Sequence, residues 1–525
     1  SIIAKKGNEG FYFFSDEDVA AIRSSAKTQW GKKIIADLEQ KVKERRKHSL
    51  EVPKEEGGHF HDYFCPVHNL QFTFRWDKPL AQYCSACDKE WIGNNRYDWA
   101  WIYEVHMLNR DYMYQCMYLY LATGKRQYAD YIRTMLLDYA GKYAGWFEHN
   151  SGRKATDQHS GKAFAQSLDE ANWATKVAMA YMAIKPVLSK EEVKAIEEGY
   201  LQPAATLLLH RPAGANWQMW HNSGLAALGI ALENDSIVDV AINKDKYGYH
   251  YLIGKHKNSD GWINEGSPHY HYYPLEALLF TANAVKCRGI KLFDKDLHDM
   301  FVEPVKGTYP DLSFPAHSDG WYGANLLSQS ALYEVGNARY NDPFLKRVLE
   351  LTYAQKKRLD PEALLSNQLI KASEESLLQK SYSFDTSGFC LLRSDTRTVV
   401  LKFGGEGIGH GHPDKLSITI HDGKNELVSD FGTSGYGVPD YLKWYKRTLS
   451  HNTVTVDAKD QKRSVGKLLK FNPRSDGGYA EAETTTAYPG VRMKRSLDLK
   501  GTHLQDVYTC TSDSSHLYEY VILFN

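Results

Sequence analysis

Two histidines separated by one glycine open the stretch GHGHPDKLSI, residues 409–418. His410 and His412 precede a run with strand-like alternation, so both imidazoles leave the chain on the approach to a β-strand. Asp430 follows in SDFGTSGYG and His451 in YKRTLSHNTVTV. On adjacent strands, His412, Asp430 and His451 would meet at one point, and two imidazoles with a carboxylate are a suitable ligand set for Zn²⁺. The alternative is a set of unrelated polar groups on strand surfaces.

A second metal-binding pattern lies near the N-terminus, in CPVHNLQFTFRWDKPLAQYCSAC. Two residues separate Cys65 from His68, and two separate Cys84 from Cys87. Two such knuckles can bring N and S ligands to one tetrahedral ion, so we expect a structural zinc that staples a loop. The alternative is three buried thiols and a surface histidine. Seven scattered cysteines argue against a disulfide scaffold.

Two further segments concentrate polar and aromatic groups ahead of expected helices. The segment DGWINEGSPHYHYYPLEAL, residues 260–278, is interpreted either as the rim of a pocket or as interior packing. In NWQMWHNSG, residues 216–224, Asn222 lies where a helix is expected to begin, so it is either an N-cap or a ligand-facing group. The candidate residues in these segments are Trp217, His221, Asn222, Glu265, Tyr270 and His271.

At these residues the chain resembles the heparinase II/III-like polysaccharide lyases, a superfamily that includes oligo-alginate lyases and exolytic heparin lyases. The matching motifs are H-x-H-x-D-x-L at 410–416, D-x-G at 430–432, Tyr436, R-T-x-x-H-N-T at 447–453 and E-x-S-x-x-Y-H at 265–271. The resemblance covers most of the chain, from about residue 95 to the end. It implies an N-terminal (α/α) toroid followed by antiparallel β-sheets.

The resemblance also implies a zinc ion, held by His412, Asp430 and His451, that shapes the site without doing the chemistry. It further implies that His410 reaches the cleft between the two domains. One histidine of the pair would therefore hold a metal while its neighbour is aimed at the substrate.

A lyase of this kind removes the C5 proton of a uronate and expels the oxygen at C4. It needs a partner for the carboxylate, a base, and an acid for the leaving oxygen. Asn222, helped by His221, is the expected carboxylate partner, and Tyr270 is the expected acid. Tyr270, His410 and His221 remain alternatives for the base, and Tyr436 would position the sugar or share the proton transfer. The expected substrate-binding residues are Glu265, His271, Arg447 and Trp217.

The pattern of hydrophobic residues changes along the chain. Helical periodicity runs from about 98 to 350, and helices of this length joined by short loops predict hairpins packed in a ring or bundle. After about 380 the period becomes two, and Asp422-Gly423 marks a hairpin, so an antiparallel β-sandwich is expected. We therefore expect three parts: an N-terminal segment (1–97) with the Cys/His knuckle, a toroid (98–370), and a β-domain (371–525). The apolar ending HLYEYVILFN leaves open that the β-domain is truncated.

Composition narrows the class of protein. Lys+Arg and Asp+Glu both number 64, so no basic field predicts nucleic-acid binding. No apolar run is long enough to span a membrane, and SIIAKKGNEG lacks the apolar core of a signal peptide. The expected partner is an acidic polysaccharide or oligosaccharide, which places the protein in the periplasm or outside the cell; the oligomeric state stays open.

Three hypotheses follow. The first is a polysaccharide lyase that acts on heparin or heparan sulfate, cleaved exolytically, with alginate as the alternative substrate. The second is a non-catalytic glycan-binding protein on the same scaffold. The third is a zinc hydrolase, which would use the same ligand types with an open coordination position.

Overall fold

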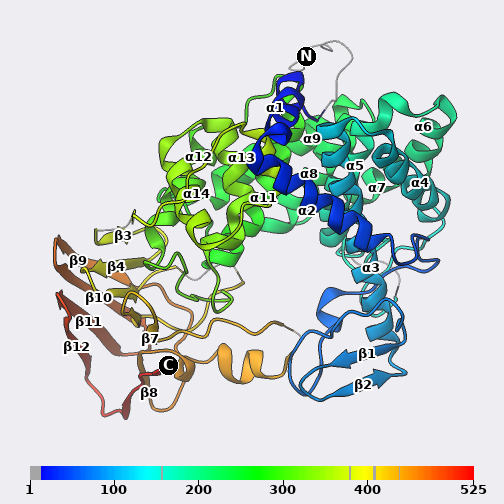
Figure 1. The fold of residues 1–525 in the computed structure, drawn as a ribbon. Helices are drawn as coiled ribbons and strands as arrows, with labels where there is room; N and C mark the ends of the chain where they lie inside the picture. The colour runs from blue at the N-terminus through cyan, green and yellow to red at the C-terminus, as the bar shows by residue number, and fades with distance from the viewer. Residues whose placement is uncertain (1–12, 155–157, 376, 378–379, 406–408, 437) are drawn as a thin grey trace.

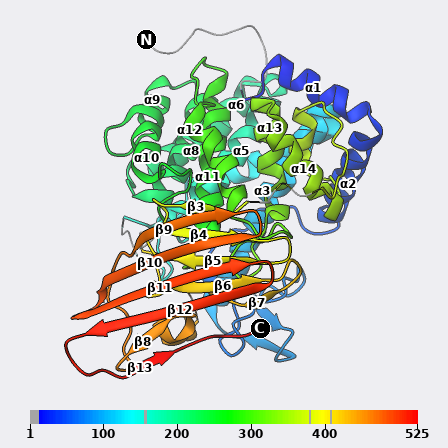
Figure 2. The same ribbon diagram turned by 90° about the vertical axis from the view of Figure 1, so that its left-hand side faces the viewer.

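A computed structural model describes residues 13–154, 158–375, 377, 380–405, 409–436 and 438–525. A helical body is followed by stacked β-sheets (Figures 1 and 2), so the predicted fold class, an (α/α) toroid followed by an antiparallel β-sandwich, is confirmed. The helices are α1 (Asp16–Lys27), α2 (Gln29–Arg45), α3 (Asn95–Thr123), α4 (Arg126–Tyr143), α5 (Ser167–Ile184), α6 (Lys190–Ile196), α7 (Gln202–Leu209), α8 (Ala215–Ala231), α9 (Asp235–Asn243), α10 (Tyr249–His256), α11 (Pro268–Lys286), α12 (Lys295–Val302), α13 (Ser330–Tyr340) and α14 (Pro343–Gln355).

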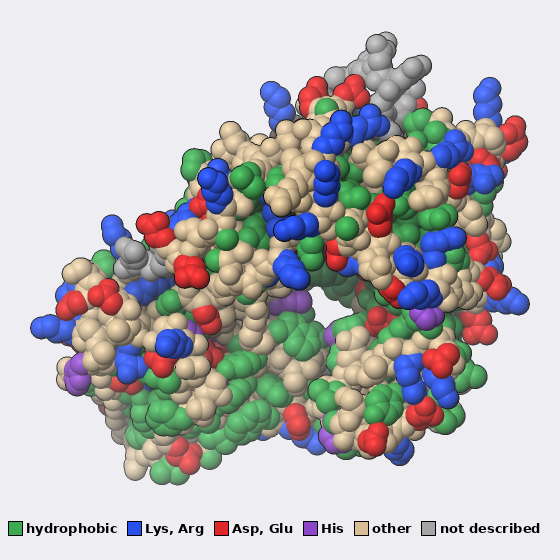
Figure 3. Space-filling view, viewed as in Figure 1, with side chains coloured by type: hydrophobic (Ala, Val, Ile, Leu, Met, Phe, Trp, Pro, Cys, Tyr) green, Lys and Arg blue, Asp and Glu red, His purple; other side chains and the backbone are tan. Residues whose placement is uncertain are grey.

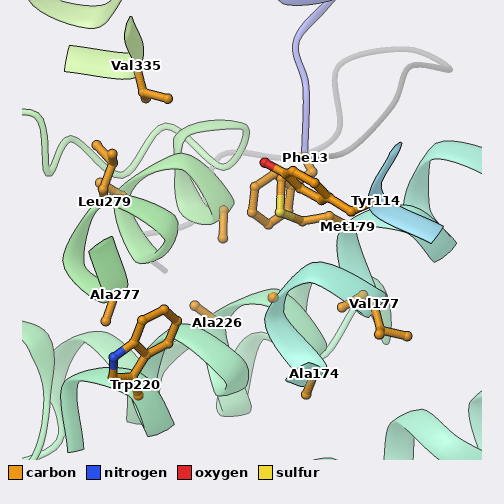
Figure 4. Packing of buried hydrophobic residues seen from close by; sticks show 14 of the residues in the cluster. Phe13, Tyr114, Ala174, Val177, Met179, Trp220, Ala226, Ala277, Leu279 and Val335 are labelled. Atoms are coloured by element: carbon orange, nitrogen blue, oxygen red, sulfur yellow. The ribbon is translucent and has the colours of Figure 1, made fainter. Parts of the chain in front are cut away.

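Four long helices, α3, α5, α8 and α11, pack against one another in succession and form the inner layer of the helical body. Helix α8 is buried almost throughout because most of its sequence, ANWQMWHNSGLAALGIA, is apolar or small and its buried polar side chains are hydrogen-bonded. Around it, Trp220, Ala226 and Ala277 belong to the same continuous core as Met179 and Leu279 (Figure 4). This core fixes the helix ends from which several site residues emerge.

The helical body begins earlier in the chain than residue 98. Helices α1 and α2 bury Ile22, Ile34 and Leu38 in the same core as the later helices. Arg339 of α13 donates to the Asp18 carboxylate at 2.5 and 3.1 Å, which joins the two ends of the helical sequence. The amphipathic pattern of these two helices therefore extends the toroid toward the N-terminus.

Between α2 and α3 the chain forms a separate unit, residues 59–92, which we call the small lobe. It contains a 3-10 turn, η1 (Phe60–Asp62), and a hairpin of β1 (Ala81–Cys84) and β2 (Lys89–Ile92). Tyr63 and Phe72, with Cys65 and Cys84, form a small core that Ala100 of α3 completes. Figure 1 shows the lobe below the helical body, beside the β-domain.

Two antiparallel sheets make up the β-domain. The first contains β3 (Tyr382–Phe384), β4 (Phe389–Arg393), β5 (Thr398–Lys402), β6 (Ser417–His421) and β7 (Glu426–Val428), and the second contains β9 (Lys467–Arg474), β10 (Gly477–Tyr488), β11 (Val491–Lys500) and β12 (His503–Ser512). A further pair joins β8 (Val454–Val456) to β13 (Tyr518–Tyr520). The predicted turn at Asp422-Gly423 connects β6 to β7, and Gly423 has the positive φ of 92° that favours glycine.

The first sheet is buried on both faces. Leu392 and Val399 face the second sheet, whereas Leu391 and Val400 belong to the core of the helical body. Both layers therefore pack on the same strands, β4 and β5, and this packing joins the first sheet to the helices. Among the helices that the structure describes, none combines the length and the apolarity needed to cross a membrane.

Candidate active site

Tyr270 lies in the first turn of α11, at the junction with the β-domain. Ser267 caps this helix, since its hydroxyl accepts a hydrogen bond from Tyr270 N at 3.2 Å. The Tyr270 hydroxyl is 2.5 Å from the hydroxyl of Tyr436, and its ring stacks on His410 with centroids 3.6 Å apart. Burial raises the pKa of Tyr270, and the hydrogen bond from Tyr436 only partly offsets this. The phenol therefore keeps its proton at neutral pH, as a general acid must.

Asp319 links both histidines of the H-x-H pair. Its Oδ2 is 2.9 Å from His410 Nδ1 and also accepts from Tyr441 at 2.9 Å and Tyr436 at 3.2 Å. Its Oδ1 is 2.9 Å from His412 Nε2. Burial raises the pKa of this carboxyl, but the bonds to the two histidines lower it well below its usual range. Asp319 is therefore ionised and accepts from both rings.

A close approach of two loops places Asp319 there. Thr433 N donates to Gly320 O at 2.9 Å, and a Cβ on Gly432 would lie 1.9 Å from that same carbonyl oxygen. Gly432, with φ of 57°, is thus required by both backbone conformation and space. This explains the glycine of the D-x-G motif: it lets the loop carrying Asp319 rest on the loop that begins at Asp430.

The hydrogen bond to Asp319 fixes the direction of the His410 ring. With Nδ1 donating to the carboxylate, the other nitrogen, Nε2, is left as the basic one. It lies 3.7 Å from Oε2 of Glu265. Glu265 is held in turn by Asn216 at the start of α8, through N at 3.1 Å and Nδ2 at 2.6 Å. Burial raises the pKa of Glu265, and its partners offset this only in part.

The residues expected to hold zinc converge in the interior of the β-domain. His451 Nδ1 lies 3.1 Å from Asp430 Oδ2, and His412 Nε2 is bound to Asp319. The remaining nitrogens, His412 Nδ1 and His451 Nε2, are buried without a hydrogen-bond partner, and the two rings lie 5.2 Å apart. Two buried imidazole lone pairs beside a carboxylate fit a Zn²⁺ ion, which would satisfy them.

A second carboxylate lies at this site. One ligand atom each of Asp414, Asp430 and His451 falls within 4.8 Å of the others. Asp414 already forms ion pairs with Lys402 and with Lys415, the latter at 3.2 Å, and these cations hold its pKa well below the usual range despite burial. We therefore assign Asp414 to anchoring the loop. His412 is not in that group of three, but its unpartnered Nδ1 and its ring next to His451 keep it a candidate zinc ligand with Asp430 and His451.

His221 and Asn222 lie inside α8. The helix begins at Ala215, so Asn222 is not an N-cap, and that alternative is wrong. Asn222 donates to Tyr247 O at 2.7 Å and accepts from Gln218 at 2.9 Å, whereas His221 Nε2 lies 3.1 Å from the Ser167 hydroxyl. Both side chains are buried. Their hydrogen bonds go to Ser167, Gln218 and Tyr247, and none of these bonds reaches Tyr270 or His410.

The four expected substrate-binding residues occupy different environments. Glu265 faces His410, as described above. His271 is fully buried and uses both nitrogens, accepting from Ile263 N at 3.2 Å and bonding Met300 O at 2.8 Å, so it supports the helix and does not face a substrate. Trp217 packs half-buried against His159, with centroids 4.8 Å apart. Arg447 is exposed and pairs with Asp460 at 2.5 Å.

Three histidines border the cluster, two of them from the small lobe. The His61 ring lies 5.6 Å from the Tyr436 ring, and His59 packs on His61. His269 packs against Tyr270, with centroids 4.9 Å apart. Burial lowers the pKa of His59, His61 and His269 to about 4, so they are neutral donors at physiological pH. Figure 3 shows an opening between the helical body, the β-domain and the small lobe, with histidine side chains at its edge.

Several of these residues were not identified from sequence. Asp319 stands in the SDG triplet of residues 318–320, a pattern typical of any surface turn. His59 and His61 lie in GHFHDY, whose density of histidines was a usable signal that carried no link to the distant motifs. Tyr441 lies in an aromatic-rich run, YLKWY, without a recognisable spacing.

Comparison with known proteins agrees with the fold. Residues 377–517 match the family described as "Heparinase II/III-like, C-terminal", and residues 105–302 match "Alginate lyase". The solved structure titled "Crystal Structure of Heparinase III" superposes with a TM-score of 0.59, covering 97% of this chain and 73% of that one at 14% identity. At that identity the likeness shows the fold alone.

Two relatives are similar in sequence. An "Alginate lyase" of Stenotrophomonas maltophilia is 29% identical over 81% of this chain and 63% of its own length. An "Exo-oligoalginate lyase" of Saccharophagus degradans is 26% identical over 81% of this chain and 64% of its own length. The chain thus spans a little under two thirds of the length of each.

The toroid, the β-sandwich and the tyrosine–histidine cluster at their junction define a class, the polysaccharide-lyase scaffold. Within that class, residues 377–517 and 105–302 match the two family models named above, and the chain is similar to the heparinase II/III-like superfamily, as the resemblance of its motifs implied.

Proposed function

We propose that this protein is a lyase that cleaves uronate-containing polysaccharides by β-elimination. The observation that carries the proposal is the contact of Tyr270, Tyr436 and His410 at the edge of the cleft, with Asp319 behind them. A protein that only bound glycans would not need a protonated phenol and an oriented imidazole in one cluster. A zinc hydrolase would place its metal beside the cleft, whereas the zinc-type ligands here are buried.

The two catalytic roles follow from protonation. Because burial raises the pKa of both Tyr270 and Tyr436, neither phenol is a base at neutral pH. We assign the base to His410 Nε2, whose ring Asp319 orients. This nitrogen takes the C5 proton, the electron pair of that bond forms the C4–C5 double bond, and the C4–O4 bond breaks. Tyr270 gives its proton to the departing oxygen.

The uronate carboxylate needs donors while charge builds at C5. We assign this task to the neutral N–H groups of His61 and His269, which border the cluster. The predicted partner Asn222 is bonded to Tyr247 O, so it would act only if that bond opened. Zinc, when bound by His412, Asp430 and His451, would supply a fixed positive charge that holds these loops together. Its role would be structural and not catalytic.

We propose alginate oligomers as the first substrate to test, ahead of heparin or heparan sulfate. The two relatives described above are named for alginate, and alginate carries carboxylates without sulfates. Among the residues that the structure describes, the cation in direct contact with the cluster is Lys446, which already donates to Tyr441 and Gly409 O at 3.0 Å. Sulfate recognition favours forked arginine contacts, and Arg447 is paired with Asp460 instead.

Exolytic cleavage is part of the proposal, since the small lobe narrows one side of the opening (Figure 3). A polymeric uronate substrate would place the protein in the periplasm or outside the cell. Mass spectrometry of the products after incubation with alginate tests the reaction type. Elimination gives a non-reducing end lighter by one water than hydrolysis gives, and a hydrolytic mass would overturn the proposal.

A further inference from the structure

Four potential metal ligands converge in the small lobe, outside the proposed active site. Cys87 Sγ lies 3.4 Å from Cys65 Sγ and 3.0 Å from His68 Nδ1. His68 Nδ1 is also 3.9 Å from the sulfurs of Cys65 and Cys84. All four ligand atoms fall within 4.8 Å of one another.

These separations fit a tetrahedral ion better than a disulfide. Bond lengths of about 2.3 Å to sulfur and about 2.0 Å to nitrogen place tetrahedral ligands roughly 3.5–3.8 Å apart. A disulfide would bring two sulfurs to about 2.0 Å, and all three cysteines are free in the structure. Three thiolates and one imidazole form a set that selects Zn²⁺.

The small lobe also requires a stabilising cross-link in addition to its hydrophobic core. Its fully buried large side chains are Tyr63 and Phe72, with Phe74 and Trp91 packed half-buried against them, and its strands β1 and β2 have only four residues each. An isolated two-stranded hairpin of this size is marginal in water, so small units of this kind depend on a metal or a disulfide. The four ligands join both ends of the lobe: Cys65 and His68 lie before the hairpin, and Cys84 and Cys87 lie at its turn.

We propose that Cys65, His68, Cys84 and Cys87 hold a structural Zn²⁺, and that this ion keeps the small lobe in place as one wall of the active site. The turn η1 ends three residues before Cys65 and presents His61 to Tyr436. The same turn is tied to α3 by Asp62, which pairs with Arg96 at 2.9 Å. The metal therefore acts on the cleft through the position of His61. This consequence for catalysis rests on the proposed lyase function, whereas the metal site itself does not.

Metal analysis tests the site directly. The double variant Cys84→Ser/Cys87→Ser is compared with Cys287→Ser, which changes an exposed cysteine far along the chain. We expect the double variant to lose one equivalent of zinc per chain, while Cys287→Ser keeps the wild-type content. Cobalt-substituted wild-type protein should show thiolate-to-metal charge transfer that the double variant lacks. Unchanged zinc content in a folded double variant would overturn the proposal.

Thiol alkylation of the wild-type protein tests the same metal site and does not depend on whether the double variant folds. Native wild-type protein is treated with iodoacetamide, with and without a strong chelator, and the modified cysteines are mapped by mass spectrometry. We expect Cys65, Cys84 and Cys87 to be protected until the chelator is added, and Cys287 to react in both conditions. Reaction of the three thiols without chelator would contradict a metal site. Resistance of these thiols to alkylation after denaturation would also contradict it, because it would indicate a disulfide.

Hydrogen exchange tests the role of the lobe. The double variant, which leaves the β-domain ligands intact, should raise amide exchange across residues 59–92 and lower kcat/KM, while exchange in β10 and β11 stays unchanged. Unchanged exchange in the lobe after loss of the metal would overturn the stapling role. If the protein has no elimination activity, the metal analysis, alkylation and exchange experiments still test whether the small lobe binds zinc. The zinc-site proposal and the lyase proposal can therefore be refuted independently.

Discussion

The hydroxyl oxygens of Tyr270 and Tyr436 lie 2.5 Å apart, although the two residues are 166 positions apart in the chain. One belongs to the helical body and the other to the β-domain. Neither half therefore contains the proposed reactive centre alone, and it forms only when the first sheet docks on the helices.

Replacing Tyr270 with Phe removes the proposed acid and keeps the ring that stacks on His410. We expect kcat to fall by about 10²–10⁴-fold, because general acid catalysis typically contributes that much, while the oligosaccharide Kd changes little. Initial rates and calorimetric titration measure the two quantities. Tyr251→Phe, at an exposed position of α10, is the control, and near-normal turnover by Tyr270→Phe would remove Tyr270 from the mechanism.

Asp319→Asn tests the link between the two histidines. The amide can still bond one ring but cannot accept from both with full charge, so we expect zinc affinity about 10–100-fold weaker together with a marked loss of kcat. Turnover should fall because the His410 ring loses the charged partner that orients it. Asp311→Asn is a matched control in a neighbouring loop that contacts His421 instead. Unchanged zinc affinity and unchanged kcat would contradict both roles of Asp319.

His451→Ala tests the zinc set in the β-domain. It removes one metal ligand and leaves the buried Asp430 without its partner, so we expect loss of one zinc per chain and a destabilisation of about 3–5 kcal/mol. Metal analysis and thermal unfolding check both effects, with the exposed His503→Ala as control. Full zinc retention by His451→Ala would exclude His451 as a ligand.

Glu362 provides a prediction for stability against pH. It lies in the turn η6 (Pro361–Leu365) and accepts from the Tyr114 hydroxyl at 2.8 Å. Burial and the nearby Asp360 raise its pKa to about 7, against about 4.3 in an unfolded chain. The folded state thus holds this proton more tightly, and its stabilising contribution is present below the unfolded pKa and is lost as pH rises to about 7.

The Glu362→Gln variant lacks this titration. Its Tm relative to wild type should therefore rise between about pH 5 and about pH 8, whereas Glu198→Gln, at an exposed position of α6–α7, should show no such trend. A Tm difference for Glu362→Gln that is constant across this range would mean that Glu362 titrates normally.

Hydrophobic periodicity was sufficient to predict that a helical half precedes a β-sheet half. Amphipathic helices and alternating strands can each be recognised from a short stretch of sequence. Motif spacing led to His410, His412 and Tyr270. Asp319 could not be found in this way, since it acts through a loop-to-loop contact that no local pattern records. The same limit applies to His61, whose approach to Tyr436 depends on how a separate lobe packs.

Burial explains the remaining differences. A polar residue within an apolar helix can be a site residue or a satisfied interior group, and only three-dimensional contacts decide. His271, predicted to bind substrate, is such an interior group, with both nitrogens used by backbone partners. The start of α8 at Ala215 rather than near Asn222 likewise depends on the bonds of Asn216 with Glu265.

The most direct test of the central claim is far-ultraviolet absorbance with zinc-loaded protein and a panel of alginate oligomers, heparan sulfate, heparin, chondroitin sulfate and hyaluronan. The unsaturated uronate formed by elimination absorbs there and a hydrolysis product does not. We predict a rise with alginate oligomers that is abolished in Tyr270→Phe. A folded, zinc-loaded protein that gives no rise with any of these uronate polymers would contradict the account.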